Sequence, residues 1–207
     1  LVRDGDLEVI ATPIDVLGVN YYSGSTVTGV PPEEAHEAAA AARATGEPTP
    51  NVGSEHVGYL RQDVEHTAMD WEVQPDGLRR LLEGLHRDYT GPAGIPLYVT
   101  ENGAAYDDVV LPDGSVDDRE RAAYVLAHVR AVADAVRAGA DVRGYFVWSL
   151  LDNFEWAYGY AKRFGIVHVD FATQRRTPKR SASVLSRVAR TGRLDGDEGS
   201  GPGTVRP

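Results

Sequence analysis

Polar and aromatic side chains follow three apolar runs in this sequence of 207 residues. Residues 20–22 (NYY) stand at the end of the first run, residues 101–103 (ENG) directly follow the second, and residues 148–156 (WSLLDNFEW) begin near the end of the third. Amide and carboxylate groups can hold the hydroxyls of a sugar, and flat indole and phenol rings can cover the apolar face of a pyranose. The combination of these side chains favours a carbohydrate site.

Glu101 and the segment 148–156 also have ordinary structural interpretations. A glutamate at the end of a strand can equally be a helix cap or an ion-pair partner, and a single tryptophan is most often part of a core. Two acidic and two indole side chains within one short segment favour binding over packing. The Asn-Gly pair that follows Glu101 is a turn signal, which would hold the carboxylate at the end of the strand.

The apolar runs at residues 14–22, 95–100 and 142–151 have the length and composition of buried strands. They alternate with helical patterns, so the sequence predicts an α/β fold with a parallel sheet covered by helices. Because ligands bind at the carboxyl ends of parallel strands, the three polar segments are expected at one rim. Periodicity alone leaves open part of a closed barrel or an open doubly wound sheet.

Three helices are predicted from residues that typically start or end a helix and from the periodicity of apolar residues. One starts at Pro75, a second begins near a capping-box pattern of Asp117 and Glu120 and stops at Gly139, and a third starts at Thr177. Their apolar residues recur at helical spacing and are expected to face inward. These residues are Leu78, Leu81, Leu82 and Leu85 in the first helix, Val125, Val129, Val132 and Val136 in the second, and Val184, Leu185 and Val188 in the third.

Residues 1–190 contain all of these patterns and are expected to form one portion of a domain. Within them, residues 31–50 are rich in Ala and Pro and predict a surface excursion with a short helix. Residues 191–207 are rich in Gly, Asp and Pro, offer almost nothing to bury, and are predicted to be a disordered tail.

The composition argues against several classes of partner. The 31 acidic and 21 basic residues give a formal net charge of −10, which disfavours nucleic acid and anionic lipid. No apolar run is long enough to span a membrane. The absence of cysteine excludes thiolate metal sites, and the six histidines have no ligand-like spacing, so no metal or other cofactor is expected. A cysteine-free chain suits the cytoplasm, which is the expected location, although the start without Met indicates truncation.

Several motifs resemble those of glycoside hydrolase family 1, the β-glucosidase family. Residues 15–22 (DVLGVNYY), 99–103 (VTENG) and 144–156 (GYFVWSLLDNFEW) look like successive signatures of this family. Residues 70–78 (DWEVQPDGL) and 162–170 (KRFGIVHVD) continue the match in family order.

The resemblance implies the C-terminal part of a (β/α)8 TIM barrel, with these strands as the sixth, seventh and eighth. Glu101 would be the nucleophile of a retaining β-glucosidase, and Tyr22 would hydrogen-bond and tune its carboxylate. The residues implied to bind a β-glucoside or oligosaccharide are Asn20, Trp71, Trp148, Glu155, Trp156 and Phe164.

Relatives that act on 6-phosphorylated sugars resemble this sequence but carry Ser in place of Glu155 and Tyr in place of Phe164. A carboxylate would repel a phosphate dianion, so the substrates implied are unphosphorylated β-glucosides, with overlap toward galactosides and fucosides. Lys162 is compatible with either class.

The sequence departs from the family in lacking the Asn-Glu-Pro motif that carries the general acid after the fourth strand. A missing N-terminal half of the barrel is therefore expected to supply the acid, and the isolated chain is expected to be inactive. Two alternatives stay open, namely a non-catalytic sugar-binding fragment and a decayed gene segment without a stable fold.

Overall fold

The computed structural model describes residues 2–29 and 57–194. The chain separates into two compact units, one formed by residues 1–23 and 66–207 and the other by residues 24–65. The larger unit contains the predicted sheet, its covering helices and all the predicted site residues.

The described part of the smaller unit is an antiparallel pair of strands, β2 (Thr26–Gly29) and β3 (Val57–Leu60). Thr26 is opposite Leu60 in this pair. The predicted excursion at residues 31–50 lies outside the described residues.

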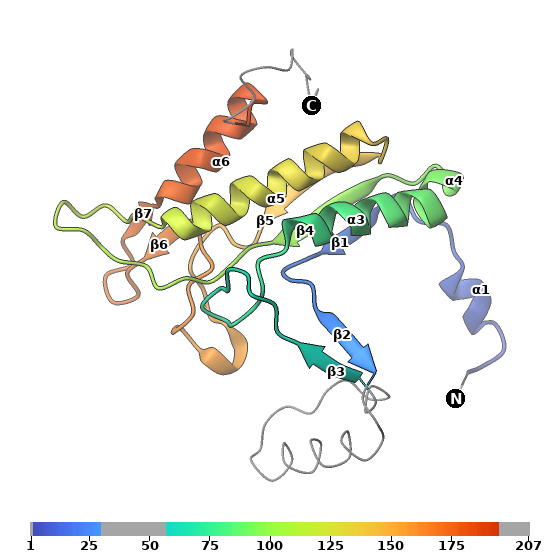
Figure 1. Cartoon of the computed structure of the whole chain (residues 1–207), viewed down its shortest axis with the longest axis horizontal. Coiled ribbons are helices and arrows are strands. Elements are labelled where there is room, and N and C mark those ends of the chain that lie inside the picture. The colour runs from blue at the N-terminus through green and yellow to red at the C-terminus, as the bar shows by residue number, and fades with distance from the viewer. Residues whose placement is uncertain (1, 30–56, 195–207) are drawn as a thin grey trace, which may run out of the picture. The chain divides into compact units, whose positions relative to one another are not determined.

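Three parallel strands form the sheet of the larger unit. β1 (Leu17–Asn20), β4 (Leu97–Asn102) and β5 (Val142–Val147) are ordered β1-β4-β5, with β4 in the centre (Figure 1). Val99 in β4 is opposite Val19 in β1. The parallel arrangement brings the carboxyl ends of all three strands to one edge of the sheet, as predicted.

The predicted strands are present, but their ends differ from the prediction. β4 continues to Asn102, so Glu101 lies within the strand and pairs across the ladder with Asn20. The Asn-Gly pair does not start a turn at this point. The ladder continues instead, because the Trp148 N–H donates to the carbonyl of Asn102 at 2.8 Å and the Tyr21 N–H to that of Glu101 at 2.9 Å.

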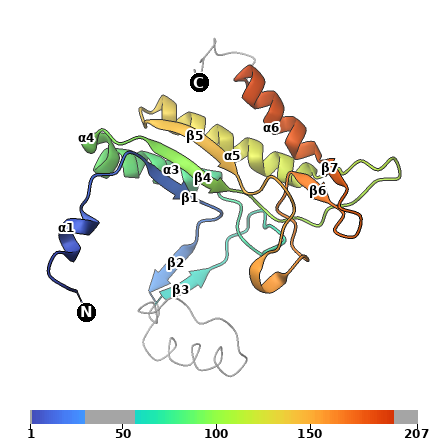
Figure 2. The same ribbon diagram turned by 180° about the vertical axis from the view of Figure 1, so that it is seen from behind.

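Helices α3 (Pro75–Leu85) and α5 (Arg119–Arg137) lie side by side over one face of the sheet (Figures 1 and 2). Apolar side chains from the strands and both helices form the core between these layers. Its buried members are Val19, Tyr21, Leu78, Leu82, Leu97, Val99, Ala135 and Ala140. On the opposite face, Thr100 is exposed and Phe146 is 57% exposed.

Two predicted inward residues are instead exposed. Leu81 is 38% exposed and Val136 is 37% exposed, whereas Ala131 and Ala135 are buried in α5. The buried face of α5 includes Arg121, His128 and Ala135, which recur every seven residues, and it is therefore not centred on the predicted valines. Val136 follows Ala135 by one residue, a rotation of about 100°, and so lies at the border of this face.

The predicted helix starts also need correction. Asp118, not Asp117, precedes α5, and its carboxylate makes no capping hydrogen bond but binds Arg121. The third helix, α6 (Arg180–Thr191), begins after the predicted Thr177. Arg176–Pro178 forms strand β7, because its backbone pairs in a hairpin rather than in a helical turn.

Shorter elements complete the larger unit. They are α1 (Asp6–Ile10), a π-helical turn (His86–Thr90), α4 (Gly91–Ala93), a 3-10 turn (Trp156–Tyr158) and β6 (Val167–Val169). β6 and β7 form an antiparallel hairpin, and α6 packs against α5 (Figure 1). Val184, Leu185 and Val188 of α6 are half-buried. Of the predicted tail at residues 191–207, Thr191 is the last residue of α6 and Leu194 is 8% exposed, and residues 195–207 lie outside the described residues.

Candidate active site

Glu101 occupies the carboxyl end of the central strand and is half-buried. The Tyr22 hydroxyl, which follows the end of β1, donates a hydrogen bond to Glu101 Oε2 at 2.5 Å. A hydrogen bond of this length restricts the rotation of the carboxylate. The predicted pair of Glu101 and Tyr22 is therefore assembled in the structure.

Two further aromatic rings surround the Tyr22 ring. Its centroid lies 5.6 Å from that of Trp71 and 6.2 Å from that of Phe164, in edge-to-face arrangements. Trp71 and Phe164 are themselves 6.0 Å apart. Burial, followed by the hydrogen bond to Glu101, raises the pKa of Tyr22 well above its usual range. Tyr22 therefore remains a neutral donor at physiological pH.

Behind this pair, a buried amide connects the ends of β1 and β4. The Asn102 side chain donates to the Tyr21 carbonyl at 2.7 Å and to the Tyr124 hydroxyl at 3.1 Å, and its Oδ1 accepts from Tyr145 at 2.7 Å. The Tyr124 hydroxyl donates in turn to the Tyr22 carbonyl at 2.8 Å. The carbonyls of two consecutive residues are thereby fixed, which sets the position of the Tyr22 phenol.

Asn20 lies opposite Glu101 in the sheet, but its side chain makes a different contact. Its Oδ1 accepts a hydrogen bond from the Thr100 hydroxyl at 2.6 Å, and both residues are exposed. Asn20 is therefore near the predicted cluster and presents its amide on the uncovered face of the sheet.

Trp148 follows β5 and is half-buried. A Cβ at Gly103 would lie 1.7 Å from the Trp148 carbonyl oxygen, so only glycine allows the two backbones to approach so closely. The Ser149 N–H donates to the Phe164 carbonyl at 3.3 Å, which places the segment after Trp148 next to the aromatic cluster.

Glu155 and Trp156 differ in their surroundings. Glu155 is half-buried, and burial raises the pKa of its carboxyl above the usual range. The negative charge of Glu155 also contributes, after burial and Glu101, to the raised pKa of Tyr22. Trp156, by contrast, is 83% exposed.

Sequence reasoning missed the residues that support this site from α5. Arg121, Tyr124 and His128 are buried on one face of that helix, at spacings of three and four. The spacing was a detectable signal, because three polar side chains on a face that also carries Val125 must find partners inside the fold.

Within residues 2–29 and 57–194, no group of three or more His, Asp or Glu side chains could hold a metal ion. None of the helices in this described part is long and apolar enough to cross a membrane.

The model of glycosyl hydrolase family 1 matches residues 1–193. β-Glucosidase A of Thermotoga maritima is 41% identical over 190 residues, covering 92% of this chain and 37% of that protein. Thermostable β-glucosidase B of Thermobispora bispora is 50% identical over 195 residues, covering 93% of this chain and 36% of that protein. A 6-phospho-β-galactosidase of Streptococcus equi subsp. zooepidemicus is 45% identical over 129 residues, covering 62% of this chain and 27% of that protein.

Solved structures give the same relationship. The family 1 β-glucosidase of Thermotoga maritima matches with a TM-score of 0.75 at 41% identity, covering 89% of this chain and 36% of that one. The same enzyme in complex with deoxynojirimycin matches with a TM-score of 0.74 at 40% identity and equal coverage. The chain thus spans little more than a third of the length of these relatives.

Proposed function

The chain belongs to glycosyl hydrolase family 1 and has the α/β fold of the C-terminal part of a TIM barrel, and from this premise we propose that it is the nucleophile-bearing part of a retaining β-glycosidase. The observation that carries the proposal is the 2.5 Å hydrogen bond from Tyr22 to Glu101 at the carboxyl edge of a parallel sheet. Active sites of TIM barrels lie at this edge. Two of the relatives are named β-glucosidases, and on this ground we propose a β-glucoside as the substrate.

Glu101 is the proposed nucleophile. Its carboxylate oxygen forms a bond to the anomeric carbon while the bond to the leaving oxygen breaks, and a general acid protonates that oxygen. Water then releases the sugar from Glu101, with the acid acting as base. Tyr22 orients the attacking carboxylate during the first step through its hydrogen bond to Oε2. The acid must lie about 5–5.5 Å from Glu101 and is proposed to come from an N-terminal part of the barrel.

The remaining predicted residues are proposed to bind the sugar. Trp148 and Phe164 provide apolar walls of the glycone pocket, and Glu155 accepts hydrogen bonds from the 4- and 6-hydroxyls, with Asn20 and Trp156 beside them. Trp71 is proposed to line the entrance for the aglycone. The three strands leave β1 and β5 as sheet edges, which the rest of the barrel is proposed to complete.

Unphosphorylated β-glycosides are the proposed substrate class. Burial raises the pKa of Glu155, which means that its surroundings already disfavour negative charge, and a phosphate dianion beside it would add to that cost. A 6-phospho-glucoside hydrolysed as fast as the plain glucoside would contradict this assignment.

The test combines this chain with the part of the Thermobispora bispora enzyme that it does not cover. Co-expression is expected to give hydrolysis of an aryl β-glucoside, whereas the chain alone is expected to be inactive. Glu101→Gln should remove several orders of magnitude of rate, while Glu120→Gln, at an exposed position of α5, should not.

A 2-fluoro-glucoside should trap the covalent intermediate on Glu101, which peptide mapping can locate. A label on another carboxylate would overturn the nucleophile assignment, and Glu101-dependent turnover by the chain alone would overturn the partial-barrel proposal.

A non-catalytic sugar-binding role is the second candidate, because the aromatic cluster is present while the Asn-Glu-Pro motif is absent from the sequence. Saturable binding of deoxynojirimycin by the chain alone, without turnover in the co-expressed complex, would favour this candidate.

A further inference from the structure

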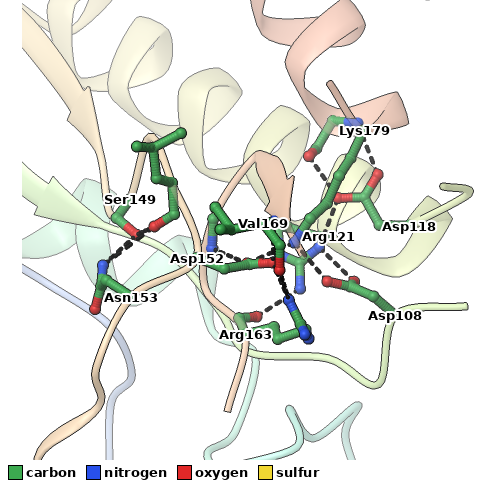
Figure 3. A network of polar contacts seen from close by, with 12 residues as sticks. Asp108, Asp118, Arg121, Ser149, Asp152, Asn153, Arg163, Val169 and Lys179 are labelled. Atoms are coloured by element: carbon green, nitrogen blue, oxygen red, sulfur yellow. Dashed lines mark hydrogen bonds and ion pairs between the residues drawn. The ribbon is translucent and has the colours of Figure 1, made fainter. Parts of the chain in front are cut away.

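Arg121 is buried at the beginning of α5, where several segments of the chain meet (Figure 3). Its side chain is 0% exposed, and its Nη1 pairs with Asp108 at 2.7 Å and with Asp118 at 2.6 Å. Its other nitrogens bind the backbone. Nε donates to the Ala104 carbonyl at 3.1 Å, and Nη2 donates to the Arg163 carbonyl at 2.6 Å.

The two carbonyls belong to the two parts of the proposed site. Ala104 comes three residues after Glu101 on the segment that leaves β4, and Arg163 immediately precedes Phe164. One planar guanidinium therefore links the segment that carries the nucleophile to the segment that carries the sugar-binding residues.

A second set of ion pairs fixes the other end of the sugar-binding segment. Asp152 accepts from Lys179 at 2.8 Å, from the Arg163 side chain at 2.6 Å and from the Gly165 N–H at 3.0 Å. Lys179 also pairs with Asp108, the carboxylate that binds Arg121. The residues between Asp152 and Arg163, including Glu155, are thus held at both ends by one network.

The network contains equal numbers of carboxylates and cations, and each of them has a partner of opposite charge. Its carboxylates are Asp108, Asp118 and Asp152, and its cations are Arg121, Arg163 and Lys179. A buried charge needs such partners, and a guanidinium supplies donors that point in different directions from one rigid plane. A lysine would keep the positive charge but has a single nitrogen, which cannot reach both carbonyls and both carboxylates.

We propose that Arg121 is a positioning residue whose guanidinium sets the separation between the nucleophile at Glu101 and the sugar-binding segment at residues 148–164. This inference rests on the proposed glycosidase function. Arg121 touches no substrate and acts through the carbonyls of Ala104 and Arg163. If that link is lost, Glu155 moves relative to Glu101 while both side chains remain present.

The expected signature is a change in substrate discrimination. Glu155 is proposed to contact the 6-hydroxyl, which a β-xyloside lacks. Displacement of its segment should therefore lower kcat/KM for a β-glucoside more than for a β-xyloside. Because misplacement by about 1 Å at a reacting centre costs about 10²-fold in rate, we expect Arg121→Lys to lower the glucoside-to-xyloside ratio of kcat/KM about tenfold. A smaller folded fraction alone lowers both values equally and leaves the ratio unchanged.

Ser181→Ala is the matched control. The Ser181 hydroxyl donates at 2.5 Å to Asp118 Oδ2, the oxygen that also accepts from Arg121, so its loss weakens the same network without disconnecting Ala104 or Arg163 from Arg121. The experiment compares the ratio of kcat/KM in the co-expressed complex for the unmodified chain, Arg121→Lys and Ser181→Ala. The expected result is a lowered ratio in Arg121→Lys alone.

An unchanged ratio in Arg121→Lys, or an equal change in Ser181→Ala, would overturn the inference while the unmodified complex remains active. An inactive unmodified complex would instead count against the proposed function. In that case, hydrogen exchange of the full chain tests the link directly. Arg121→Lys should increase exchange in residues 103–106 and 149–165 together, and increased exchange in neither or only one of these segments would overturn the inference.

Discussion

Acidification is expected to destabilise this chain through His128. This residue is fully buried in α5, its ring stacks on Tyr124 with centroids 3.9 Å apart, and its Nδ1 lies 2.8 Å from the Tyr124 carbonyl. A carbonyl oxygen can only accept, so Nδ1 carries the proton and Nε2 does not. Among the described residues Nε2 has no hydrogen-bond partner, and a second proton would therefore create a buried charge without a partner.

Burial accordingly lowers the pKa of His128 from 6.5 to about 4. Between these two values the unfolded chain binds a proton that the folded chain does not, so stability is intact above the higher value and falls as the pH drops toward the lower one. Each pKa unit corresponds to about 1.4 kcal/mol, so the free energy of unfolding should fall by about 2 kcal/mol at pH 5 and by about 3 kcal/mol at pH 4.

Urea unfolding of the chain and of His128→Phe at several pH values between 4 and 7.5 measures this loss. Phenylalanine keeps an apolar ring against Tyr124 but cannot bind a proton. The carboxylates titrate in both proteins, so the difference between the two pH profiles isolates His128. Parallel profiles for the two proteins would refute the reasoning, because the buried imidazole would then not be the group that couples pH to stability.

Three further substitutions test individual contacts. Tyr22→Phe in the co-expressed complex removes the donor to the nucleophile and should lower kcat about 10- to 100-fold, whereas an unchanged kcat would contradict its role. Gly103→Ala should lower the free energy of unfolding by about 1–3 kcal/mol in urea titrations, because its Cβ would meet the Trp148 backbone at 1.7 Å. Gly77→Ala should destabilise the chain by about 1 kcal/mol or more despite the better helix propensity of alanine, because its Cβ would lie 2.2 Å from the Tyr21 hydroxyl. A gain in stability at this position would show that the phenol can move without cost.

Much of the scaffold could be predicted from the sequence because the relevant patterns are local. A short apolar run followed by Glu101 indicates a buried strand with a carboxylate at its end, and Pro75 and Gly139 mark helix boundaries that the structure confirms. The resemblance to family 1, now shown, rests on the same kind of local motif. The roles assigned to the sugar-binding residues stay predictions.

The contacts that support the candidate site depend instead on tertiary structure. The hydrogen bond from Tyr124 to the Tyr22 carbonyl joins residues separated by 102 positions, and Arg121 bridges segments that no periodicity relates. The sequence alone indicated that α5 has a buried face, since spacing determines which residues share a face. It did not indicate what Arg121, Tyr124 and His128 would meet there. Their partners come from strand ends and loops that approach only when the helix packs on the sheet, and burial then requires each polar group to find one.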